Sequence, residues 1–78
     1  MKRRIKLTFP PDLIKEPIVF TVAKRFDITP NIRRARITET VGEMVLEIDG
    51  ADELIEQAVA ALREKGVEVE LVEGDILQ

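Results

Sequence analysis

The stretch MVLEIDGADELIEQAVAALREKGVEVEL, residues 44–71, carries the pattern on which the fold prediction rests. Met44, Leu46 and Ile48 occupy alternate positions, which is typical of a strand with one buried face. Over 52–66 the apolar residues recur at three- and four-residue spacing, as on one face of a helix, and a glycine closes the run. Alternation returns over 67–71. This half of the chain is therefore predicted to be strand, helix, strand.

The first half repeats that order. Residues 4–9 alternate between polar and apolar and end at Pro10, which predicts a strand. A helix is predicted from about Glu16 to Phe26, because apolar residues recur there every four positions and Pro17 suits a first helical turn.

A hairpin is predicted to join the two halves. Residues 29–31 (Thr-Pro-Asn) have the composition of a turn, and a strand reaches from there to about Thr38. The apolar residues of this strand are out of phase with one another, which a bulge at Arg33 or Arg34 reconciles. A turn around Gly42 then leads into the strand over 44–48.

These elements predict one α+β domain over residues 1–78 with the order βαββαβ. The simplest arrangement is a ferredoxin-like sandwich: a four-stranded antiparallel sheet in the order 4-1-3-2, with both helices on one face. Residues 72–78 are interpreted as a frayed end or the start of a linker.

Charge is distributed unevenly along the chain. Residues 1–38 hold ten Lys or Arg and three Asp or Glu, and residues 39–78 hold two and twelve. In the order 4-1-3-2 acidic and basic strands alternate, so the outward side chains are predicted to form a self-complementary face with opposite charges across neighbouring strands. A surface for anions is the alternative. The outward positions hold no aromatic residue on which bases could stack, so no nucleic acid partner is expected.

Composition argues against an enzyme. The chain has no His, Ser, Tyr, Trp or Cys, which removes the usual general base, the usual nucleophiles and the commonest metal ligands. The acidic residues near position 52 are interpreted as complementing the positive end of a helix dipole. We therefore expect no catalytic residue, no metal and no cofactor. The absence of a long apolar run predicts no membrane insertion and a cytoplasmic location, and the high Glu, Lys and Arg content suggests a thermophile.

Asn31 is the candidate for ligand contact. It is the only asparagine in the chain, and its amide both donates and accepts hydrogen bonds. The guanidinium groups of Arg33 and Arg34 follow closely and suit a carboxylate. An Asx turn, with no ligand, is the alternative interpretation. The candidate ligand-binding residues are thus Asn31, Ile32 and Arg33.

The segment FDITPNI, residues 26–32, taken with the predicted element order, resembles the NIL domain, an ACT-like regulatory family named for an Asn-Ile-Leu motif. Further likeness lies in the opening RIKLTFP over 4–10, the helix start at 16–18 and the run LREKGVEV over 62–69. Arg33 stands where the family's name has Leu.

The resemblance implies a domain that senses methionine or a related sulfur amino acid and pairs as a homodimer. Family members occur at the C-terminal end of methionine-importer ATPase subunits and ahead of ferredoxin modules in proteins of sulfur amino-acid metabolism. A transporter or a ferredoxin-type protein is therefore the implied partner. The alternative is a protein-interaction module that docks such a partner without binding a metabolite.

Overall fold

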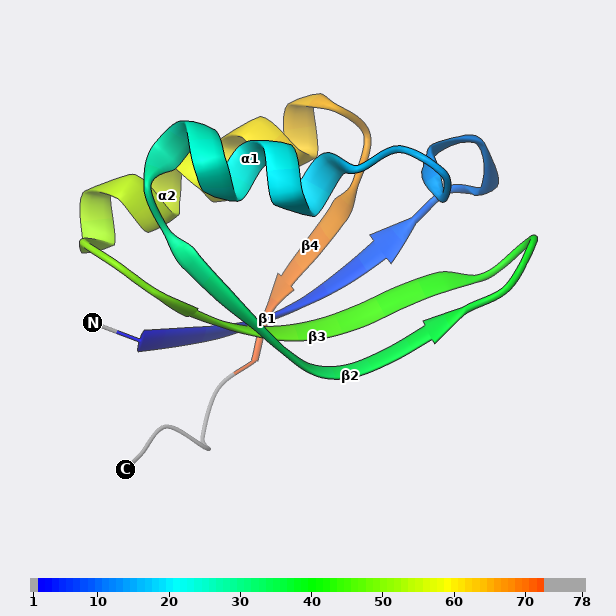
Figure 1. Cartoon of the computed structure of the whole chain (residues 1–78), viewed down its shortest axis with the longest axis horizontal. Coiled ribbons are helices and arrows are strands. Elements are labelled where there is room, and N and C mark those ends of the chain that lie inside the picture. The colour runs from blue at the N-terminus through cyan, green and yellow to red at the C-terminus, as the bar shows by residue number, and fades with distance from the viewer. Residues whose placement is uncertain (1, 73–78) are drawn as a thin grey trace.

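Four strands and two helices follow one another in the order βαββαβ, as predicted (Figure 1). The computed structural model describes residues 2–72, and the predicted frayed end lies outside them except for Val72. The elements are β1 (Lys2–Phe9), α1 (Ile18–Phe26), β2 (Thr29–Ile37), β3 (Gly42–Asp49), α2 (Asp52–Glu64) and β4 (Glu68–Leu71). A short 3-10 helix, Pro11–Leu13, lies between β1 and α1.

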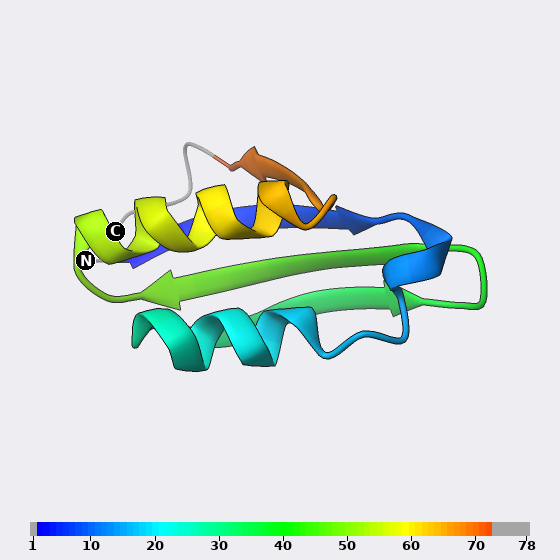
Figure 2. The ribbon, with the colours of Figure 1, turned by 90° about the horizontal axis from the view of Figure 1, so that it is seen from above.

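The strands form one antiparallel sheet in the order β2-β3-β1-β4, which confirms the predicted order. The central strands β1 and β3 pair along their whole length, from Lys2 opposite Asp49 to Phe9 opposite Gly42. Both helices cover the same face of the sheet, side by side, and leave the other face open (Figure 2). The molecule therefore has a covered face that holds the core and an open face of polar side chains.

The core lies between the helices and the sheet. Its largest fully buried side chains, Ile5, Leu7, Leu46 and Ile48, come from the two central strands. Burying an aliphatic side chain of this size stabilises the fold by about 1.5–3 kcal/mol. The other buried apolar residues are Phe9, Ile18, Val22, Ala23, Ile28, Ile55, Ala58, Val59, Leu62 and Val67. The periodic residues of the sequence are thus the ones that form the core.

The start of α1 differs from the prediction by two residues. The helix begins at Ile18 because Pro17 has a φ of −80° and a ψ of 54°, which is not a helical conformation. The N–H of Ile18 instead bonds to the carbonyl of Glu16 at 2.8 Å. The end of α2 agrees with the prediction, since Gly66 follows it at a φ of +104°, where glycine carries no side-chain penalty.

The predicted turn at residues 29–31 is wrong, because these residues already belong to β2. The chain reverses earlier, at Asp27, which adopts the left-handed conformation (φ 56°, ψ 47°). Thr29 then pairs with Asp49 at the end of β3. Pro30 is tolerated inside this strand because β2 is an edge strand, where a missing N–H costs no ladder hydrogen bond. The predicted bulge is confirmed by a register shift between Ile32 and Arg34.

Candidate functional site

Asn31, Ile32 and Arg33 lie in the middle of β2, at the outer edge of the sheet. Asn31 is opposite Glu47 on the open face, whereas Ile32 is opposite Leu46 on the covered face. Arg33 is the extra residue of the bulge. All three are exposed, and none of them lines the three cavities described below. The predicted residues therefore form an exposed stretch of edge strand, with side chains on both sides of the sheet.

The outer edge of β2 is uncovered within residues 2–72. The strand is nine residues long and has β3 as its one neighbour. All of its side chains are exposed except that of Pro30, which is half-buried. A long edge strand presents unpaired N–H and C=O groups that can pair with another strand. The residues around the β2 edge are therefore a candidate surface for contact with another chain.

Three large apolar side chains are exposed near this edge. Phe20 of α1 is 70% exposed, Ile32 is 58% exposed and Ile37 is 48% exposed. Ile32 and Ile37 face the helix side of the sheet, since their partners in β3 are Leu46 and Gly42. Single exposed apolar residues are common, but three beside one unpaired strand mark a surface that a partner could cover. We call Phe20, Ile32 and Ile37 the apolar edge.

A hollow of about 150 Å³ opens beside the apolar edge, between the start of α1 and the ends of β1, β2 and β3. Phe20 and Ile37 line it together with Phe9, Ile14, Glu16, Pro17, Ile18, Val19 and Met44. One sign of this feature is present in the sequence, because Phe20 lies off the apolar stripe that Ile18, Val22 and Phe26 form on its helix. The second sign is Ile37, an apolar residue at the end of an edge strand. The sequence alone cannot distinguish such a residue from a core residue, because its burial depends on where the helices lie over the sheet.

The open face shows the predicted alternation of charge. Arg4 of β1 is directly opposite Glu47 of β3, and the guanidinium lies 3.3 Å from the carboxylate. Farther along the same face, Arg36 of β2 is opposite Glu43 of β3. Acidic and basic strands thus lie side by side as expected. Such pairs contribute roughly 0.2–1 kcal/mol each, which makes them supports of the sheet and not a site in themselves.

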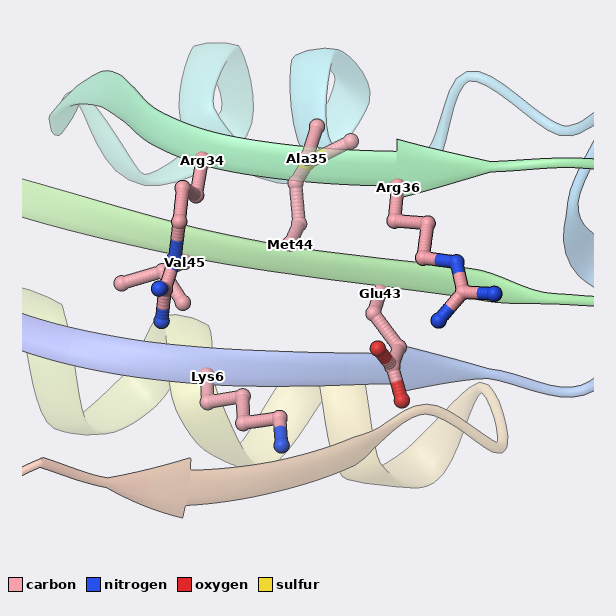
Figure 3. Close-up of a pocket in the computed structure, with 7 residues that line it drawn as sticks. All are labelled: Lys6, Arg34, Ala35, Arg36, Glu43, Met44 and Val45. Carbon is pink, nitrogen blue, oxygen red and sulfur yellow. The ribbon is translucent and has the colours of Figure 1, made fainter.

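Two further cavities involve the open face. One, of about 320 Å³, lies over β1, β2 and β3 and is lined by Lys6, Arg34, Ala35, Arg36, Glu43, Met44 and Val45 (Figure 3). The other, of about 460 Å³, lies along β4 and the end of α2 and is lined by Lys6, Thr8, Arg63, Gly66, Val67, Glu68, Val69 and Glu70. Both are shallow depressions and not enclosed chambers. The first is notable because three of its side chains are cationic.

Residues 2–72 contain no group of three or more Asp, Glu, His or Cys placed to hold a metal ion. In the same part of the chain, no helix combines the length and the apolar character needed to cross a membrane.

The element order and the sheet topology define a ferredoxin-like α+β domain. The family comparison then gives its membership: residues 3–71 match the model of the NIL domain, and the chain belongs to that family. The resemblance carried by residues 26–32 and by the flanking runs is thereby confirmed.

Curated relatives of this chain are methionine import ATP-binding proteins. The chain is 37% identical over 68 residues to "Methionine import ATP-binding protein MetN 2" of Acinetobacter baylyi, covering 82% of this chain and 20% of that protein. It is 27% identical over 74 residues to the protein of the same name from Bacillus licheniformis, covering 90% and 22%. The chain thus spans about a fifth of the length of these relatives.

Solved structures support the same fold. The C-terminal domain of an ABC transporter ATP-binding protein from Enterococcus faecalis superposes with a TM-score of 0.83 at 23% identity, covering 94% of this chain and 86% of that domain. A de novo designed protein, Foldit4, superposes with a TM-score of 0.58 at 20% identity. Identities this low speak for the fold alone.

Proposed function

We propose that this chain is a non-catalytic regulatory domain that senses methionine or a related sulfur amino acid at a homodimer interface formed by β2. Its setting is the cytoplasmic side of a methionine transporter or another protein of sulfur amino-acid metabolism. The observation that carries the proposal is the uncovered β2 edge with Asn31, Ile32 and Arg33 at its centre. The names of the matched relatives support this class of ligand, since both are methionine import ATP-binding proteins.

Pairing of two β2 strands follows from the chemistry of the edge. Antiparallel addition of a second β2 about a two-fold axis extends the sheet and satisfies the free backbone groups of both copies. It also covers the apolar edge, whose Ile32 side chain is 58% exposed in the single chain. A small domain of this length gains much from such burial, because its own core is limited.

The ligand has a defined part in this arrangement. Arg33 is the central residue of β2, so a two-fold axis through the strand brings it near the Arg33 of the second copy. Two guanidinium groups repel each other across such an axis, and a bound carboxylate offsets the repulsion. Asn31, two residues away, supplies an amide that can donate to a carboxylate or accept from an ammonium group. Amino-acid binding and dimerisation are therefore coupled.

The test is a thermal-shift titration of the whole chain with methionine, homocysteine and cysteine. A ligand present at 100 times its Kd stabilises the folded state by about 2.7 kcal/mol, which is a readily measured rise in Tm. Asn31→Ala is expected to lose most of that rise. Gln57→Ala, which removes an exposed amide from α2, is the control and keeps it. A chain whose Tm responds to none of the amino acids is not a sensor of this class.

The second candidate is a protein-interaction module that docks a transporter subunit or a ferredoxin-type partner without binding a metabolite. The hollow lined by Phe20 and Ile37 favours it, because an apolar side chain of a partner fits there without any amino acid. Partner binding that is lost in Phe20→Ser but unaffected by methionine supports this candidate against sensing.

A further inference from the structure

The open-face cavity interrupts the charge alternation described above. Lys6 of β1 and Arg34 of β2 are both opposite Val45 of β3, so the three residues form one row across the sheet. In the rows on either side the central strand supplies a carboxylate, Glu43 in one and Glu47 in the other. In this row it supplies an apolar side chain between two cations.

Within the described residues, the two cations of the row have no side-chain partner. Among residues 2–72, the side chains of Lys6 and Arg34 make no hydrogen bond and no ion pair, whereas Arg4 lies 3.3 Å from Glu47. Figure 3 shows the Arg34 side chain reaching over β3 beside Val45, with Lys6 on the adjacent strand. Glu70 of β4 is opposite Lys6 in the register, on the side away from Val45. Val45 thus lies between two cationic strand positions, with the Arg34 guanidinium beside it and the Lys6 side chain directed toward β4 (Figure 3).

We propose that this row binds a small organic acid, with its carboxylate held by Arg34 and Lys6 and its apolar part resting on Val45. The two outer strands of such a row lie about 10 Å apart, a span that the long Arg and Lys side chains can close on one carboxylate. The lining holds three cations, Lys6, Arg34 and Arg36, and one carboxylate, Glu43, so its net charge is +2.

The size and polarity of the cavity limit the ligand. A volume of about 320 Å³ accommodates a molecule of a few carbon atoms and lies at the lower end of the range for ligand pockets. Glu43 at one end disfavours a ligand with several negative charges. A monocarboxylate with a short branched chain is the class that fits both cations and the apolar floor.

This site is separate from the proposed sensing site. Asn31 lies in the neighbouring row, opposite Glu47, and does not line the cavity. The open-face site needs no second copy of the chain, so it is expected to bind in the monomer and in Asn31→Ala alike. Failure of the sensing proposal therefore leaves this one standing, and the reverse also holds.

The probe for the test is isovalerate, with isovaleramide as its uncharged counterpart. Binding is followed by amide chemical shifts of the full chain in NMR titrations. We expect saturable shifts centred on Lys6, Arg34 and Val45 with isovalerate and none with isovaleramide. Arg34→Gln and Lys6→Gln are each expected to weaken binding about tenfold, the effect of losing one charge-assisted hydrogen bond. Lys24→Gln, on the exposed surface of α1, leaves the affinity unchanged.

A second variant keeps the proposal testable if those substitutions disturb the sheet. Val45→Glu supplies the missing carboxylate, so we expect it to abolish isovalerate binding and to raise Tm above that of Val45→Gln. Equal binding of isovalerate and isovaleramide, or unchanged affinity in Arg34→Gln, overturns the proposal. So does binding of a short oligothymidylate in place of isovalerate, which assigns the face to nucleic acid, or of sulfate with equal affinity, which leaves a nonspecific cationic patch.

Discussion

Asp27 is the non-glycine residue with a positive φ among residues 2–72, and it determines where β2 begins. Its left-handed conformation ends α1 and lets the N–H of Ile28 bond to the carbonyl of Ala23 at 3.1 Å. Ile28 is then buried against the core and Thr29 enters the sheet. One backbone conformation thus sets the position of the whole candidate site.

Asp27→Gly is expected to stabilise the domain. A residue other than glycine costs roughly 1–2 kcal/mol in the left-handed region, although Asp and Asn tolerate it better than most, and glycine offsets part of this gain through its freedom in the unfolded chain. A net increase of about 0.5 kcal/mol in the free energy of unfolding is expected, measured by denaturant titration.

Gly66→Ala is the matched variant for which we expect the opposite effect, a loss of stability. Gly66 has a φ of +104°, and an added Cβ would lie 3.3 Å from Cδ1 of Leu13. A loss of about 1–2 kcal/mol is expected from the backbone alone. If Asp27→Gly destabilises the domain as Gly66→Ala does, then Asp27 contributes more through its side chain than its backbone conformation costs.

The sequence identified Asn31 as a polar residue free for contact but placed it in a turn. Thr, Pro and Asn favour turns through local hydrogen bonds and a fixed φ, and these preferences are weak beside the pairing of an edge strand. The neighbouring residues do not distinguish a proline in a turn from a proline in an edge strand, because in neither place does its nitrogen need to donate a hydrogen bond. Only the sheet order resolves the difference.

At the scale of elements, the periodic spacing of hydrophobic residues was sufficient to predict the strands and helices. The alternation at Ile5, Leu7 and Phe9 and the helical spacing within Asp52–Glu64 each correspond to residues that the structure buries. The bulge was also predictable, since Ile32 and Ile37 face the same side of the sheet only if one extra residue separates them. The exposure of Ile32 and Ile37 could not be predicted, because it depends on how far α1 extends across the sheet.

The pairing of charge across strands can be tested at Arg36 and Glu43, which are opposite each other in β2 and β3. Arg36→Glu and Glu43→Arg each place like charges opposite one another and are expected to lower the free energy of unfolding by up to about 1 kcal/mol. The double variant restores opposite charges and is expected to recover most of the loss. A double variant as unstable as the sum of the two single ones contradicts a cross-strand interaction.

At the scale of the whole molecule, the basic and acidic halves of the chain contribute alternating strands to the sheet. The basic first half supplies β1 and β2 and the acidic second half supplies β3 and β4, so the order β2-β3-β1-β4 alternates their signs. This arrangement opposes pairing of β1 with β2 or of β3 with β4 as sheet neighbours, since like charges would then be opposite. The charge pattern therefore favours the observed topology, which the sequence allowed us to predict.

The two edges of the same sheet differ in what they offer to a second copy. β2 has nine residues and β4 has four, although each edge carries an exposed apolar side chain, Ile32 at 58% and Leu71 at 47%. Dimerisation through β2 predicts that Ile32→Lys yields a monomer by light scattering at concentrations where the native chain is a dimer. Short edge strands resist pairing, so Leu71→Lys is expected to leave the dimer intact.

The same pair of variants distinguishes assembly from folding. Ile32 is exposed, so its replacement by lysine removes little core packing and is expected to change the free energy of unfolding of the monomer by less than about 0.5 kcal/mol. A native chain that stays monomeric at high concentration with methionine present contradicts the β2 dimer. If Leu71→Lys gives the monomer and Ile32→Lys does not, the interface lies at β4, and Asn31 then has no place at the centre of it.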